Sequence, residues 1–295
     1  MEDGEPTGPG RSEELVYYVY RPKTALRGSC LAVHGVTSTS RAWQFFARTM
    51  VEQHSIAVYA LDLRGRGDSN GIMGKFGLRQ HAADCIKVMD HAQLEKVDWA
   101  VGHSMGAFVV ATLCHVAPTR VEKNVFLDGG VPLPLPAEFT VETIVPHILG
   151  PALKRLSMTF SKEGYIEFFQ KHPAFIKGWS PELDEYCRYD LHVDKPSTNP
   201  RSVEEDTRDL FGEGIVHDAI ALMDRDVLLI RAERGLQNEP VPLYPHEYIV
   251  SILHEKYPRI KLKTLADTNH YNILLSKEGA DGCIALMLDF DFAKP

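Results

Sequence analysis

The strongest constraint on the fold is an alternation between short apolar segments and longer segments with helical spacing. The apolar segments have strand-like lengths and lie at Leu15–Tyr20, Cys30–Val33, Ile56–Leu61, Val97–Val101, Val125–Leu127, Val227–Ile230 and Ile260–Leu265. Helix-like segments between them span Trp43–Glu52, Leu78–Leu94 and Met105–Val116. Strands that are apolar nearly throughout are buried on both faces. The sequence therefore predicts an α/β fold whose mostly parallel sheet is covered by helices on both faces.

The alternation stops after Val131 and resumes near residue 215. The segment between opens with three prolines in five residues and is then rich in aromatic side chains. We expect a helical insertion over residues 132–214, flanked by a core built from residues 13–131 and 215–295. Residues 1–12 are rich in Gly, Pro and Glu, and we expect them to form a disordered lead-in.

The composition indicates where the protein is located and which classes of binding partner are disfavoured. A chain of 295 residues with 44% hydrophobic residues suits one large domain with an insertion. The net charge of −8 gives no support to a nucleic-acid or anionic-membrane partner. The sequence shows no signal-peptide pattern and no apolar run near the roughly 20 residues that span a bilayer. Five cysteines without a Cys-x-x-Cys pair indicate a reducing compartment, so we expect a soluble, cytoplasmic protein.

The clearest chemical motif is Gly102-His103-Ser104-Met105-Gly106, between a predicted strand and a predicted helix. A nucleophile at the tip of a sheet needs a very tight strand-to-helix turn, and small residues two positions away on each side allow it. The helix that follows points its free N–H groups at developing negative charge. Ser104 is the predicted nucleophile.

Acyl transfer also needs two backbone donors for the oxyanion, one after the nucleophile and one in a loop after an earlier strand. The N–H groups of Met105 and Val36 fit these places, since Val36 follows the strand that ends in His34-Gly35. We expect His34 to hold this loop by hydrogen bonds rather than to act as a base.

Of the thirteen histidines, His270 is the predicted general base, because it follows the last strand and precedes the last helix. His103 adjoins the nucleophile and is expected to point away from it along the strand. His246 and His254 lie on a predicted helix, and neither has a second histidine at zinc-helix spacing. We therefore expect no metal site and no cofactor.

Together with Asp62-Leu63-Arg64-Gly65-Arg66-Gly67-Asp68-Ser69, these motifs resemble the α/β-hydrolase superfamily over almost the whole chain. The resemblance implies an eight-stranded sheet and a helical cap inserted after the sixth strand. The aromatic segment after Val131 falls at that point.

The acid that orients the base departs from the common family pattern. Members usually carry an Asp shortly after the seventh strand, where this chain has Gly235. A second known placement is the end of the sixth strand, occupied here by Asp128. Glu233 is the alternative acid, and we favour Asp128 because a triad is recognised by roles rather than by order. The sixth-strand placement resembles haloalkane dehalogenases and the lactonases that act on macrolide mycotoxins such as zearalenone.

The expected activity is that of a serine hydrolase cleaving a carboxylic ester or lactone through an acyl-enzyme. The expected substrate is an apolar small molecule of moderately large size, and a bulky resorcylic macrolactone is one candidate. A homodimer is compatible with the sequence, which does not determine the oligomeric state. The candidate substrate-binding residues are Trp179, Leu133, Leu135, Met158, Phe160, Tyr189 and Tyr271.

Two alternatives stay open. One is a carbon–carbon bond hydrolase of vinylogous diketones, in which Arg188 or Arg155 would bind a substrate carboxylate. The other is a ligand receptor that retains the hydrolase triad and signals through movement of the cap.

Overall fold

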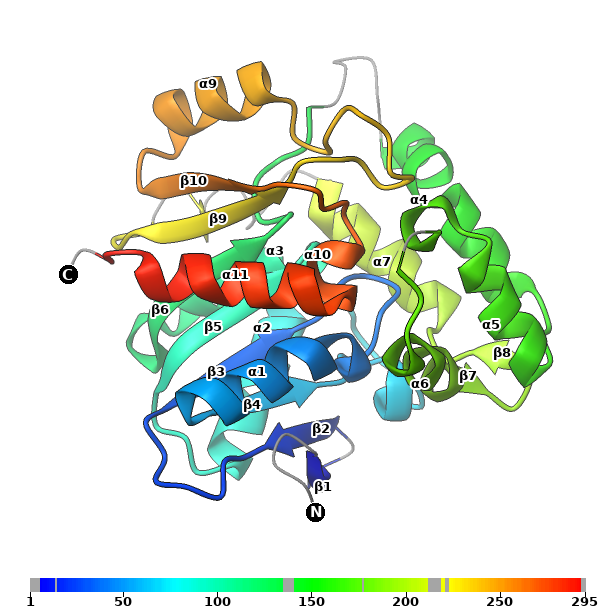
Figure 1. The fold of residues 1–295 in the computed structure, drawn as a ribbon, viewed down its shortest axis with the longest axis horizontal. Helices are drawn as coiled ribbons and strands as arrows, with labels where there is room; N and C mark the ends of the chain where they lie inside the picture. The colour runs from blue at the N-terminus through cyan, green and yellow to red at the C-terminus, as the bar shows by residue number, and fades with distance from the viewer. Residues whose placement is uncertain are drawn as a thin grey trace.

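The computed structural model describes residues 6–13, 15–134, 141–176, 178–211, 219–220 and 223–292 (Figure 1). Its centre is a sheet of eight strands in the spatial order β1-β2-β4-β3-β5-β6-β9-β10. The strands are β1 (Pro6–Ser12), β2 (Leu15–Tyr20), β3 (Gly28–Val33), β4 (Ile56–Leu61), β5 (Val97–His103), β6 (Val121–Leu127), β9 (Val227–Ala232) and β10 (Ile260–Leu265). The β1–β2 and β2–β4 pairs are antiparallel, and the other pairs are parallel. The predicted fold class is confirmed.

The N-terminal segment differs from the prediction. We expected disorder over residues 1–12, but Pro6–Ser12 forms the edge strand β1 and pairs with β2. An edge strand needs hydrogen-bonding groups on one side only, so it tolerates proline. The register shifts between Pro6 and Pro9, as expected where prolines interrupt the ladder. Composition alone therefore misjudged this segment, because it ignored the free edge that β2 offers.

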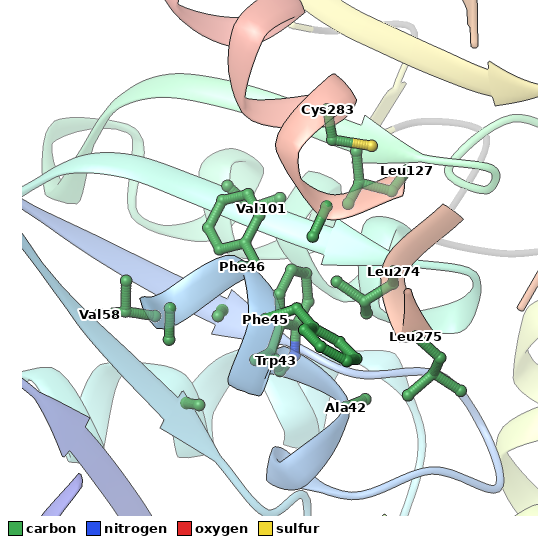
Figure 2. Packing of buried hydrophobic residues seen from close by; sticks show 14 of the residues in the cluster. Ala42, Trp43, Phe45, Phe46, Val58, Val101, Leu127, Leu274, Leu275 and Cys283 are labelled. Atoms are coloured by element: carbon green, nitrogen blue, oxygen red, sulfur yellow. The ribbon is translucent and has the colours of Figure 1, made fainter. Parts of the chain in front are cut away.

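Two groups of helices cover the two faces of the sheet. Helices α2 (Leu78–His91), α3 (Met105–Val116) and α9 (His246–Lys256) pack in one apolar cluster. Helices α1 (Gln44–His54), α10 (Asn272–Leu275) and α11 (Lys277–Asp289) pack in the other, shown in Figure 2. Strand residues alternate between the clusters: Val58 faces α1, and its neighbour Tyr59 faces α2 and α3. The inner strands β2, β3, β4, β5, β6 and β9 are therefore buried on both faces nearly throughout, as their apolar sequences predict. The edge strand β10 is largely exposed, which corrects the expectation for Ile260–Leu265.

Between β6 and β9 the chain forms four described helices and a short hairpin. The helices are α4 (Val141–Ser157), α5 (Lys162–Gln170), α6 (Pro181–Asp190) and α7 (Pro200–Phe211), and the hairpin pairs β7 (Leu191–His192) with β8 (Lys195–Pro196). Figure 1 shows these elements gathered at one end of the sheet. They lie within the predicted insertion, whose bounds of 132–214 stay a prediction.

A buried ionic cluster attaches the insertion to the core. Arg66 Nη2 lies 2.6 Å from Asp206 Oδ2 of α7, and both side chains are fully buried. His81 Nε2 of α2 and the Gly77 N–H contact the other Asp206 oxygen, at 2.9 and 2.6 Å. These contacts fix α7 against the loop that follows β4.

All five cysteines are buried and free. No helix in the described ranges is both long enough and apolar enough to cross a membrane.

Candidate active site

Ser104 occupies a tight turn between β5 and α3. Its backbone has φ +54° and ψ −122°, outside the regions that residues with a β-carbon usually adopt. The flanking glycines are required by close approach. A β-carbon at Gly102 would lie 2.3 Å from the Gly106 carbonyl oxygen, and one at Gly106 would lie 2.0 Å from the Val33 oxygen. The Gly-x-Ser-x-Gly pattern thus forms the sharp turn for which it was singled out.

His270 lies in the turn between β10 and α10, and its ring contacts Asp128. Nδ1 is 2.7 Å from Asp128 Oδ2, and the Ala232 N–H donates to Oδ1 at 3.0 Å. Asp128 is fully buried directly after β6 and has a positive φ of 43°. A carboxylate at Nδ1 favours the tautomer with the proton on that nitrogen. Nε2 is then left free to accept a proton.

Glu233, the alternative acid, lies elsewhere. Its side chain is exposed, and Oε2 accepts a hydrogen bond from the Asp267 N–H at 2.8 Å. At Gly235, where the family usually has its acid, a β-carbon would lie 2.7 Å from the Val241 oxygen. Of the two candidates, Asp128 is therefore the one in contact with His270. Its role as the acid stays a prediction.

A cavity of about 650 Å³ opens beside Ser104, His270 and Asp128. Val36 and Met105, the predicted oxyanion donors, both line it. The loop that carries Val36 lies close to Ser104, since a β-carbon at Gly35 would be 3.2 Å from Ser104 Cβ. The walls are largely apolar and aromatic, and the insertion contributes to them with Leu149, Ala152, Phe168, Phe169, Phe175, Leu210 and Phe211.

Two of the predicted substrate-binding residues, Leu133 and Tyr271, line this cavity. Leu135 lies outside the described residues. Contrary to the prediction, four candidates do not line the cavity: Trp179, Met158, Phe160 and Tyr189.

Local contacts explain these four errors. Trp179 Nε1 donates to Asp184 at 2.7 Å, and the Tyr189 hydroxyl donates to buried Asp62. Phe160 packs against other rings inside the insertion, and Met158 follows the last turn of α4. The aromatic content of the insertion therefore indicated which region forms the cavity wall. It did not indicate which helix faces, and so which residues, line the cavity.

Sequence reasoning also missed the cavity residues in the loop after β9, which supplies Leu236, Gln237, Glu239 and Leu243. The available signal was topological. In a parallel sheet, loops that follow the carboxyl ends of the strands meet at one edge.

His34 holds its loop, as expected. Nε2 accepts a hydrogen bond from the Leu63 N–H at 3.0 Å, and Nδ1 donates to the Gly35 carbonyl at 2.8 Å. Burial lowers the pKa of His34 to about 3. The ring is therefore neutral near pH 7, as its accepting Nε2 requires.

His103 is a correction, because its side chain does not point away from the site. It lines the cavity, and its ring centroid lies 4.8 Å from that of His270. The unusual conformation of Ser104 breaks the simple strand alternation on which the expectation rested.

Arg155 of α4, one of the two arginines that were candidates to bind a substrate carboxylate, lines the cavity. Nη1 lies 2.9 Å from buried Asp190, and Nη2 donates to the Thr37 carbonyl at 3.2 Å. Arg188 is exposed and does not line the cavity. Within the described ranges, no group of three or more His, Cys, Asp and Glu side chains could hold a metal ion.

Known proteins resemble this chain in part of its sequence and in its fold. Abhydrolase domain-containing protein C22H12.03 of Schizosaccharomyces pombe is 29% identical over 116 residues, which cover 39% of this chain and 42% of that protein. The match thus spans less than half of that relative's length.

Two solved structures share the fold at low identity. E-2-(acetamidomethylene)succinate hydrolase superposes with a TM-score of 0.72 and 14% identity, covering 96% of this chain and 98% of the other. The thioesterase domain from the curacin biosynthetic pathway gives a TM-score of 0.71 and 14% identity, with the same coverage of 96% and 98%. The family described as "Alpha/beta hydrolase family" matches residues 30–281. The chain belongs to the alpha/beta hydrolase family.

Proposed function

We propose that the protein is a serine hydrolase that cleaves a carboxylic ester or lactone, with Ser104, His270 and Asp128 as its triad. The observation that carries this proposal is the 2.7 Å contact between His270 Nδ1 and Asp128 at a cavity that also exposes Ser104. Ser104, His270 and Asp128 come from three separate turns that line this cavity, which supports giving them the roles of nucleophile, base and orienting acid.

The chemistry follows from this arrangement. His270 Nε2 takes the proton of the Ser104 hydroxyl as the oxygen attacks the substrate carbonyl. The N–H groups of Val36 and Met105 stabilise the oxyanion, an effect worth roughly 3 kcal/mol per donor. Collapse of the tetrahedral intermediate expels the alcohol, which receives the proton from His270. Water, deprotonated by His270, then attacks the acyl-enzyme and releases the carboxylic acid and Ser104.

The cavity supports a moderately large apolar substrate. Its volume of about 650 Å³ suits a small molecule with several rings. Aromatic side chains from α5 and the turn after it line the same space as Ser104 and His270. A resorcylic macrolactone is one substrate of this kind. Its alcohol would stay attached to the acyl group, so that the reaction opens the ring.

Carbon–carbon bond hydrolysis of a vinylogous diketone acid has weaker support. That reaction would use a cation in the cavity to bind the substrate carboxylate. Arg155 is the candidate, but Asp190 already balances its charge in a buried ion pair. A ligand receptor would use the same cavity. Repeated turnover of a substrate would identify the protein as an enzyme rather than a receptor.

The test is turnover by the wild type and Ser104→Ala with short nitrophenyl esters, a simple lactone, a resorcylic macrolactone and a vinylogous diketone acid. We expect the wild type to hydrolyse at least one ester or lactone. Ser104→Ala should lose this activity and still bind the substrate, because the hydroxyl contributes little to binding. Unchanged turnover in Ser104→Ala would refute the proposal, and cleavage of the diketone acid alone would support the alternative.

A further inference from the structure

His103 connects the nucleophile turn to the turn that carries the base. It immediately precedes Ser104 in the chain, and its Nε2 lies 2.8 Å from the main-chain oxygen of His270. A carbonyl oxygen can only accept a hydrogen bond, so Nε2 must carry the proton. This contact fixes the His270 backbone with respect to the residue next to the nucleophile.

The contact matters because the side chains of Ser104 and His270, the proposed nucleophile and base, are not held together by a hydrogen bond of their own. Among the described residues, no hydrogen bond links Ser104 Oγ to the His270 ring. Asp128 holds the far side of that ring through Nδ1. The distance between Nε2 of His270 and Ser104 Oγ therefore depends on where the base turn is held, and His103 holds its main chain.

The surroundings of His103 keep its ring neutral. Its side chain is buried, and burial together with the neighbouring His270 ring lowers the pKa of His103 to about 3. Its ring stays uncharged beside His270, at a tilt of 38° between the two planes. A neutral ring does not repel the imidazolium that forms when His270 takes the serine proton.

We propose that His103 is a positioning residue, which holds the general base His270 at the nucleophile through its Nε2–H hydrogen bond to the His270 carbonyl. The inference rests on the proposed function, because it assigns His270 the role of base. It makes the residue before the nucleophile part of the hydrolytic machinery without requiring contact with the reacting atoms.

The test compares two replacements of His103. In His103→Gln an amide N–H reaches the place of Nε2, whereas His103→Leu fills a similar volume without a donor. The readout is the rate at which a fluorophosphonate labels Ser104, since this reaction needs the base but no knowledge of the substrate. Melting temperatures are measured in parallel, and kcat and KM are added with any ester that the wild type cleaves.

We expect His103→Leu to label at least about tenfold more slowly, because small displacements of a catalytic group are costly. His103→Gln should recover most of the rate, and the loss should appear in kcat rather than KM. If the Leu variant does not fold, His103→Asn replaces it, since its amide ends short of the ε position. Thr112→Val on α3 is the control. It removes a buried hydrogen bond to the Phe108 oxygen and should alter stability without slowing labelling.

The outcomes separate the two proposals. A wild type that is not labelled at Ser104 would overturn the proposed function itself. Normal labelling in His103→Leu, or equally slow labelling in folded Gln and Leu variants, would overturn the role of His103 and leave the triad intact.

Discussion

At the scale of single residues, the two catalytic candidates that follow adjacent strands both have strained backbones. Ser104 has a φ of +54° and Asp128 a φ of +43°, each costing on the order of 1–3 kcal/mol for a residue with a β-carbon. Gly129 allows the two turns to approach, because a β-carbon there would lie 2.2 Å from the Ser104 oxygen. Such strain persists only where the surroundings impose it, and it commonly accompanies function.

Replacing each candidate acid tests which carboxylate orients His270. Asp128→Asn should keep the shape of the site but favour the wrong tautomer of His270, and it should reduce kcat roughly 10³–10⁴-fold. Glu233→Gln should change kcat less than about twofold, because Glu233 is exposed and accepts a hydrogen bond from the Asp267 N–H in a turn rather than contacting His270. The measurement is kcat for an ester in both variants and in the wild type. The reverse ranking would identify Glu233 as the acid.

The sequence predicted the turns that carry Ser104 and His270 because their motifs are local, and the roles of nucleophile and base stay predictions. It could not decide between Asp128 and Glu233, since that choice depends on which turn faces His270 in space. It also missed the position of the His103 ring and the true cavity walls. These depend on helix rotation and on one strained residue, neither of which follows from local spacing.

At the scale of elements, the insertion is attached through charges buried at its base. Arg66 is fully buried and donates through Nε to the Val36 carbonyl at 3.0 Å, while its Nη2 pairs with Asp206 of α7. The same guanidinium therefore contacts both the loop that carries Val36 and the insertion. The pKa of Asp206 is held well below its usual range by the charges of Arg66 and His81, against the effect of burial.

Asp206→Asn should therefore destabilise the fold strongly. It leaves the Arg66 charge buried without its partner, and breaking such a pair costs about 3–5 kcal/mol. Glu204→Gln is the matched control on α7, because its exposed pair with Arg208 should contribute less than about 0.5 kcal/mol. Urea unfolding compares the two variants, and equal midpoints would contradict the structural role of the buried pair.

Apolar runs predicted the strands β2, β4 and β10 to the residue, and an apolar helix-like segment predicted α3. β2 and β4 are apolar because the sheet buries both of their faces, whereas β10 lies at the sheet edge and is largely exposed. Pro6–Ser12 failed the same reasoning, since an edge strand is selected by backbone pairing rather than by side-chain burial.

At the scale of the whole molecule, buried neutral histidines link stability to pH. The pKa values of His34 and His103 are both lowered to about 3, chiefly by burial, whereas an unfolded histidine has its ordinary value near 6.5. Between these values the unfolded chain binds protons that the folded chain does not. Stability therefore falls as the pH drops from about 6.5 towards 3.

At pH 5 the expected loss relative to pH 7.5 is on the order of 2 kcal/mol per histidine. Burial raises the pKa of Asp62, which acts in the opposite direction. Urea unfolding at both pH values should show a smaller difference in His34→Gln than in the wild type. Replacement of exposed His115 by Gln should leave the difference unchanged. Identical pH dependence in His34→Gln and the wild type would contradict the account.

The most direct test of the central claim is mass spectrometry of protein quenched with acid during turnover of an ester. The account predicts that the mass of the substrate's acyl group appears on the peptide that contains Ser104, and that Ser104→Ala shows neither this adduct nor turnover. An acyl group on another residue, or continued hydrolysis by Ser104→Ala, would contradict a serine acyl-enzyme mechanism.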